Sequence, residues 1–175
     1  MNKRLRFTLI VSIAILAVAG GIAVRQLVHD DREQGLNELQ HLALPDLNGQ
    51  ALSFSQWHGK IIVVNFWATW CDPCREEVPA LVRIQQQRSA QGVQIVGVGI
   101  DSADKMRQFA ATYRVNYPLV VAGLDAIEVS RKLGNRAGGL PFTVVLDRKG
   151  RFVASHLGGL TEQALNEILR PLLAS

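Results

Sequence analysis

Residues 61–79 read IIVVNFWATWCDPCREEVP and carry the strongest structural signal in the sequence. Its first seven residues are β-branched or apolar apart from Asn65, which is typical of a strand buried on both faces. Cys71 and Cys74 follow at once, and the residues from Glu76 to Gln87 have the apolar spacing of a helix. The stretch therefore predicts a buried strand that leads into a helix, with both thiols at the junction.

The two cysteines are the only ones in the 175 residues. A stabilising disulfide usually closes a long loop, whereas this pair closes almost nothing, so its purpose is expected to be chemical. Thiols at i and i+3 of a helix face the same way. The first would lie among unpaired helical N–H groups, which stabilise its thiolate, and the second is close enough to attack a mixed disulfide. This placement predicts a redox centre.

A CxxC pair can instead supply half of a zinc site. Such a site needs two more ligands, and the four histidines form no ligand-like cluster in the sequence: His29, His41, His58 and His156. Redox chemistry is therefore favoured, and no metal or cofactor is expected.

The N-terminal segment has the pattern of a membrane anchor. Residues 1–6 are basic, and residues 7–24 carry no charge. As a helix the uncharged run would be roughly 27 Å long, close to the roughly 30 Å thickness of the hydrocarbon layer. The positive-inside rule places residues 1–6 in the cytoplasm and the residues after the membrane segment in the periplasm or outside the cell. The chain is thus expected to be a single-pass protein of the inner membrane. A cleaved signal peptide is the alternative, because Ala17-Val18-Ala19 fits a cleavage site, but the apolar run continues past it.

Beyond the membrane segment we expect a linker over residues 25–40 and one α/β domain over residues 41–175. Strand-like and helix-like patterns alternate there: a hairpin at 42–54, a strand at 93–100, a helix capped by Ser102, a strand at 119–121, a helix at 125–133, a hairpin at 142–157 and a helix capped by Thr161. This order predicts a mixed central sheet with helices on both faces.

Charge gives no sign of nucleic-acid binding. The formal net charge is +4, and three of the cations, Lys3, Arg4 and Arg6, precede the apolar run. No later stretch interleaves cations with aromatic residues, so no nucleic-acid partner is expected.

Residues 64–79 resemble the active-site segment of the TlpA/ResA family, membrane-anchored thioredoxin-like proteins of bacterial envelopes. Residues 139–143 resemble the cis-proline loop of that family, and residues 100–122 resemble its extra strand and helix. The resemblance implies a thioredoxin fold, with Cys71 as the exposed attacking thiol and Cys74 as the resolving thiol.

Two further site residues are implied in the same way. Pro141 would be cis and face the disulfide, where the neighbouring backbone can bind an extended substrate segment. Glu77 matches a glutamate near the cysteines that can move protons; a solvated helix carboxylate is the plainer interpretation. Plain thioredoxins carry a buried aspartate where this chain has Asn65, and an amide cannot carry protons. The route by which thioredoxins move protons therefore does not apply to this chain. This favours Glu77 or water as the proton carrier.

The favoured function is a reductant of disulfides in exported proteins, with apocytochrome c as one client and a transmembrane electron donor of the DsbD/CcdA type. Asp72 places negative charge near Cys71, and Pro73 restricts the loop, so both favour a reducing centre. A disulfide oxidase or isomerase is an alternative. So is a copper-handling module, although the SCO proteins of that kind carry CxxxC with a distant histidine.

Overall fold

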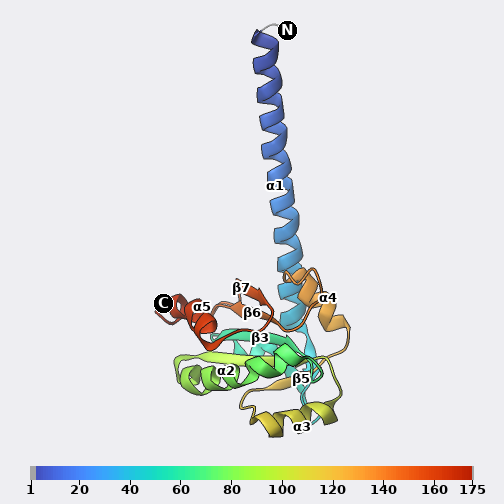
Figure 1. Ribbon diagram of the computed structural model, residues 1–175, viewed down its shortest axis with the longest axis vertical. Helices are drawn as coiled ribbons and strands as arrows, with labels where there is room; N and C mark the ends of the chain where they lie inside the picture. The colour runs from blue at the N-terminus through green and yellow to red at the C-terminus, as the bar shows by residue number, and fades with distance from the viewer. Residues whose placement is uncertain (1–2, 175) are drawn as a thin grey trace.

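The computed structural model describes residues 3–174, together with the side chains of residues 12–22 and 26–174. A long N-terminal helix projects from an α/β domain (Figure 1). The elements are, in order, α1 (Lys3–His41), β1 (Ala43–Pro45), β2 (Ala51–Ser53), the 3-10 turn η1 (Phe54–Trp57), β3 (Ile61–Trp67), α2 (Asp72–Arg88), η2 (Ser89–Gln91), β4 (Val93–Gly99), α3 (Ala103–Tyr113), β5 (Leu119–Val121), α4 (Asp125–Lys132), β6 (Phe142–Leu146), β7 (Phe152–Leu157) and α5 (Glu162–Leu173).

The predicted strand β3 lies at the centre of a five-stranded sheet of order β5-β4-β3-β6-β7. β4 runs parallel to both β3 and β5, whereas β6 runs antiparallel to both β3 and β7. Every residue of β3 is buried, as its sequence predicts. The mixed sheet confirms the predicted thioredoxin-like fold, and α3 with β5 forms the predicted additional helix and edge strand.

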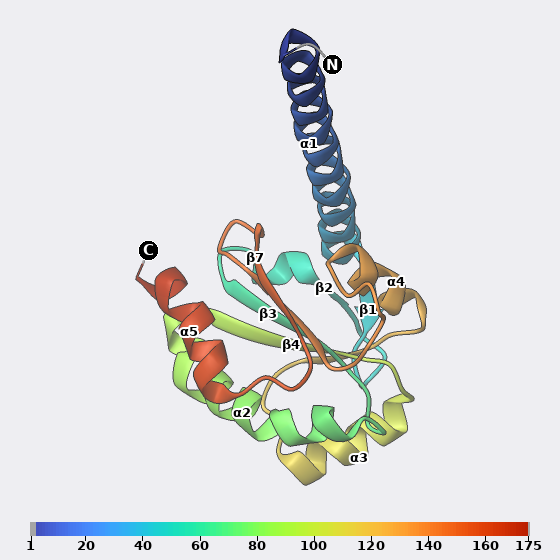
Figure 2. The same cartoon turned by 45° about the horizontal axis from the view of Figure 1, so that its top comes forward.

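Helices cover both faces of this sheet (Figure 2). One core lies under α2, α3 and α5, and the other lies under α4, η1 and the end of α1. Side chains of a strand alternate between faces, so Val63 and Trp67 belong to the first core and Val64 and Phe66 to the second. By the same alternation, Asn65 falls on the face that α2 covers.

The structure differs from the predicted linker over residues 25–40. This segment is helical and continues α1 as far as His41. Its end packs on the domain, because Leu36 and Leu39 are buried in the second core. A Cβ placed on Gly35 would lie 2.8 Å from the Cβ of Lys132, so the backbone of α1 closely approaches α4. The leucine spacing was visible in the sequence, but the surface of α4 that covers it was not.

The boundaries of the predicted membrane segment, residues 7–24, stay predictions. Within the described residues, one helical stretch, Ser12–His41, is long and apolar enough to cross a membrane. A membrane anchor and a signal sequence both have this character.

Two predicted helix caps have different outcomes. Thr161 caps α5, and its hydroxyl accepts a hydrogen bond from the N–H of Ala164 at 3.2 Å. Ser102 occupies the N-cap position of α3, but its side chain makes no capping bond. Instead, its backbone N–H donates to Asp101 Oδ1 at 2.8 Å. The carboxylate beside the predicted cap, rather than the serine hydroxyl, therefore accepts a hydrogen bond there.

Candidate active site

The two cysteines form a disulfide at the start of α2. Cys71 is the N-cap residue, and its Sγ accepts a hydrogen bond from the N–H of Cys74 at 3.3 Å. Pro73 lies in the first turn, where its missing N–H costs no helical hydrogen bond. The sulfur of Cys71 thus sits at a helix N-terminus, where N–H groups and the helix dipole favour negative charge.

The two cysteines differ in accessibility. Cys74 is fully buried, whereas Cys71 keeps 6% of its surface. The sequence resemblance implies an exposed Cys71; in this disulfide form it is the more accessible cysteine, yet it is mostly covered. Trp70, directly before it, is 64% exposed, while Trp67 is core, packed on Phe109 with ring centroids 4.6 Å apart. Attack on this disulfide therefore has to come from the side of Cys71.

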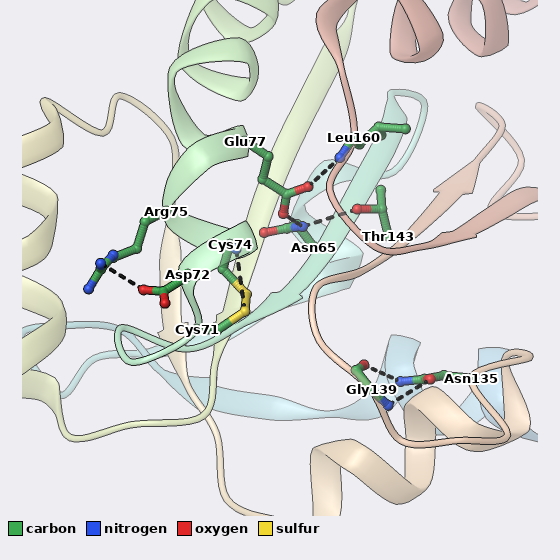
Figure 3. Close-up of a disulfide and its surroundings, with 10 residues drawn as sticks. All are labelled: Asn65, Cys71, Asp72, Cys74, Arg75, Glu77, Asn135, Gly139, Thr143 and Leu160. Carbon is green, nitrogen blue, oxygen red and sulfur yellow. Dashed lines mark hydrogen bonds and ion pairs between the residues drawn. A yellow bond between two sulfur atoms is a disulfide. The ribbon is translucent and has the colours of Figure 1, made fainter.

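Glu77 lies on the same side of α2 as Cys74, with its carboxylate turned toward Asn65 and Leu160 (Figure 3). Its side chain is buried rather than solvated. One carboxylate oxygen accepts from Asn65 Nδ2 at 2.7 Å, and the other accepts from the N–H of Leu160 at 2.8 Å. Burial raises the pKa of Glu77 from 4.5 to about 7, against the lowering effect of these two hydrogen bonds. The group can therefore gain and lose a proton near neutral pH.

Asn65 connects Glu77 to the neighbouring strand. Its Nδ2 also donates to the hydroxyl of Thr143 at 3.0 Å. Asn65 and Thr143 are register partners on β3 and β6, so their side chains lie on the same face of the sheet. The sequence identified Asn65 only as a missing aspartate. Its partner Thr143 was not predicted, because pairing across 78 residues depends on the register of the strands.

The charge of Asp72 is partly offset. Its Oδ1 lies 2.7 Å from Nη2 of Arg75, one turn further along α2 (Figure 3). Both side chains are exposed, and such surface pairs contribute little stability. Their proximity nevertheless places a cation beside the anion that was expected to oppose the Cys71 thiolate, which weakens the part of the argument for a reducing centre that rests on Asp72.

The loop before β6 contains the predicted cis peptide bond, between Leu140 and Pro141. Asn135, a buried residue just after α4 that the sequence did not single out, holds this loop. Its side chain donates to the carbonyl of Gly139 at 2.9 Å and accepts from the N–H of Gly139 at 3.1 Å (Figure 3). The carbonyl of Pro141 accepts from the N–H of Gly158 at 2.9 Å. The loop is thus fixed from both sides.

The turn before Cys71 is tied to the neighbouring β4–α3 connection. The hydroxyl of Thr69 donates to Asp101 Oδ2. Partial burial alone would raise the pKa of Asp101, but hydrogen bonds from Thr69 and Ser102 and the ammonium of Lys105 outweigh it and lower this pKa. Asp101 is therefore an anion, and its hydrogen bond from Thr69 fixes the turn that precedes Cys71.

Comparison with known proteins agrees with this geometry. A family model described as Redoxin matches residues 32–169. The chain belongs to the Redoxin family. It is 32% identical to the thiol-disulfide oxidoreductase ResA of Halalkalibacterium halodurans over 178 residues, which cover 97% of this chain and 96% of the relative. It is 31% identical to ResA of Bacillus subtilis, over 76% of this chain and 73% of the relative.

Solved structures of other proteins share the fold. A thiol:disulfide interchange protein of the thioredoxin family from Chlorobium tepidum is 26% identical, with a TM-score of 0.67, over 74% of this chain and 90% of that one. A DsbF homologue from Corynebacterium diphtheriae is 25% identical, with a TM-score of 0.69, over 77% and 85%. This Redoxin-family chain is accordingly a thiol-disulfide oxidoreductase of the ResA type, with a CxxC pair.

Proposed function

We propose that this oxidoreductase reduces disulfides in exported proteins, with Cys71 as the attacking thiol and Cys74 as the resolving thiol. The observation that carries these two cysteine roles is the hydrogen bond from the N–H of Cys74 to Cys71 Sγ, combined with the complete burial of Cys74. A helix N-terminus stabilises the thiolate of its N-cap residue, while a buried thiol is protected from clients until a mixed disulfide brings it a target.

The reaction balances as two thiol–disulfide exchanges. The Cys71 thiolate attacks one client sulfur, forms a mixed disulfide and releases the other client sulfur as a thiolate, which takes up a proton. The Cys74 thiolate then attacks Cys71 Sγ and releases the second client thiolate. The client gains two electrons and two protons, and the enzyme is left with the Cys71–Cys74 disulfide.

Glu77 is proposed to accept and return the proton of Cys74. Three observations support this role: its place one turn after Cys74, its burial, and its pKa of about 7. A pocket of about 320 Å³ is lined by Glu77, Pro73 and Leu160 among others, and offers protons a way to solvent. Pro141 is proposed to present adjacent backbone to an extended client segment, which the fixed geometry of its loop supports.

Localisation and partners complete the proposal. Residues 7–24 would anchor the chain in the inner membrane, with the catalytic domain, residues 41–175, facing the periplasm or the cell exterior. Apocytochrome c is proposed as one client among exported proteins. Because a reductant in an oxidising compartment must be recharged, a transmembrane electron donor of the DsbD/CcdA type is proposed as the second partner.

A disulfide oxidase is the second candidate, and one observation favours it. Stabilisation of the Cys71 thiolate by the helix N-terminus stabilises the reduced form, which makes a centre more oxidising. The pairing of Asp72 with Arg75 removes part of the opposing effect. The direction of electron flow therefore depends on the reduction potential.

The test is redox equilibration of the protein against glutathione or dithiothreitol. We expect a potential near or below that of thioredoxin, about −270 mV. A potential near that of DsbA, about −120 mV, would contradict the reductase assignment and favour the oxidase, leaving the roles of the cysteines intact.

A further inference from the structure

A polar pocket lies between α1, α4 and β7, away from the disulfide. Its volume is about 240 Å³, and its lining includes Asp31, Arg32, Arg131, Lys132, Arg136 and Ser155. Four of these side chains are cationic and one is anionic. Figure 1 shows α4 and β7 on the side of the domain from which α1 extends, whereas α3 lies at the opposite end. The pocket is therefore on the face turned toward the apolar part of α1.

Two of the four cations have no carboxylate partner. Lys132 pairs with Glu38, and Arg131 lies 3.5 Å from Glu128. By contrast, Arg32 and Arg136 form no ion pair with any of the described side chains. Cζ of Arg32 lies 4.2 Å from the centre of the Phe152 ring, which holds the guanidinium in place.

Arg32 also carries an unsatisfied donor. Its Nε is buried and has no hydrogen-bond partner among the described residues. Buried guanidinium N–H groups are almost always satisfied, so Arg32 has hydrogen-bonding capacity that the described residues leave unused. An anion in the pocket would contact Arg32 and Arg136. Among the lining side chains, only Asp31 would repel it.

The distance of the pocket from the apolar part of α1 indicates where such an anion would come from. This step rests on the proposed anchor, residues 7–24. At about 1.5 Å per residue, Val28 lies roughly 6 Å and Arg32 roughly 12 Å beyond the end of the apolar run. The polar headgroup layer extends roughly 5–8 Å beyond the hydrocarbon on each side. The pocket therefore opens at the outer boundary of the headgroups, within reach of long arginine side chains.

We propose that this pocket binds the headgroup of an anionic phospholipid, with Arg32 and Arg136 as its principal phosphate ligands. The lipid would be held against the domain beside the anchor. No covalent step is involved, and the disulfide chemistry takes place elsewhere on the molecule.

The test uses the full chain in neutral detergent, titrated with phosphatidylglycerol or phosphatidylcholine, with bound lipid counted by native mass spectrometry. We expect tighter binding of phosphatidylglycerol. Arg136→Gln should weaken it about fivefold, since a basic residue near an anionic surface contributes about 1 kcal/mol. Arg107→Gln is the matched control: it removes the same charge from α3, at the far end of the domain, and should leave binding unchanged.

Three outcomes would overturn the proposal: equal affinity for the two lipids, equal losses in the two variants, or inorganic phosphate binding as tightly as phosphatidylglycerol. The last would identify a free anion rather than a lipid as the ligand. Failure of the anchor is distinguished by carbonate extraction of cell membranes, which would release a cleaved chain. The pocket residues lie beyond the candidate cleavage site, so the detergent titration remains informative in that case.

Discussion

Asn65 donates a hydrogen bond across 2.7 Å to the buried carboxylate of Glu77, and so joins the central strand β3 to the helix that carries both cysteines. The same amide nitrogen donates to Thr143 on β6. The carboxylate is thus held by one strand from below and by the N–H of Leu160 from the side. This arrangement keeps an ionisable group in the core one helical turn from the buried thiol.

Stability should depend on pH through Glu77. Its pKa is about 7 in the folded protein against an ordinary value of 4.5, so between these pH values the folded state binds more protons than the unfolded state. The free energy of unfolding should therefore fall as pH rises through this range, by about 3 kcal/mol from this group. Glu77→Gln should abolish that fall, measured by urea unfolding between pH 4.5 and 8.

Glu76→Gln is the matched control, because Glu76 is the exposed neighbour and should retain the wild-type pH dependence. In the reduced protein, alkylation of Cys71 should likewise lose its inflection near pH 7 in Glu77→Gln only, since an ionised Glu77 disfavours a nearby thiolate. Unfolding and alkylation curves that run parallel to wild type would return Glu77 to a purely structural role.

Replacing Asn65 by aspartate should raise the pKa of Glu77 further. The change removes a donor and places a second carboxyl group at the 2.7 Å contact, where two like charges cannot both ionise cheaply. Asn65→Asp should lower the free energy of unfolding by about 2 kcal/mol or more at pH 8 and by much less at pH 5. Thr143→Val, which removes the hydroxyl that accepts from Asn65 and changes no charge, should cost about 1 kcal/mol at both pH values. An equal loss at pH 5 and pH 8 in Asn65→Asp would count against the charged contact.

Replacement of Cys71 and replacement of Cys74 by serine should have different effects on the reaction with clients. Cys71→Ser should abolish insulin reduction and form no mixed disulfides, because the buried Cys74 is inaccessible to clients. Cys74→Ser should also lose turnover but accumulate mixed disulfides on Cys71, detectable by non-reducing electrophoresis. Trapping through Cys74 in the Cys71→Ser variant would reverse the proposed roles.

Gly35 should be required for docking of α1 on the domain. A methyl group there would press on the Cβ of Lys132, which cannot move independently of the α4 backbone. Gly35→Ala is expected to increase hydrogen exchange across residues 30–41 severalfold while insulin reduction is retained. Gly20→Ala is the control in the same helix, because nothing lies within 4 Å of its added Cβ. Unchanged exchange in Gly35→Ala would mean that α1 and α4 separate slightly at no cost.

The sequence predicted most of the fold because its signals are local. The β-branched run of β3, the hairpin turns and the Thr161 cap each lie within a few residues, and the CxxC pair marks the start of α2 by itself. The predicted roles of Cys71, Cys74, Glu77 and Pro141 stay predictions, although the structure brings the first three together on α2.

What the sequence missed depends on contacts between distant segments. The Asn65–Thr143 pair requires the β3–β6 register, and the bond of Asn135 to Gly139 requires the path of the loop. Glu77 is buried in part because Leu160, 83 residues further along the chain, lies against it. The helical structure of residues 25–40 was missed for the same reason, because a charged segment with two apolar leucines has the same sequence pattern whether or not another helix covers it.

The docking of α1 on α4 has a mechanical consequence. A flexible tether would let the catalytic domain tumble freely, so that the disulfide sampled every direction. A helix locked to the domain by Gly35, Leu36 and Leu39 transmits its own tilt and rotation to the sheet instead. If the apolar part of α1 lies in a bilayer, the helix would hold the disulfide at a fixed distance from the membrane surface and in a fixed orientation around the helix axis. Encounters with membrane-bound partners would then become a search in two dimensions, in which approach from the correct side limits the rate.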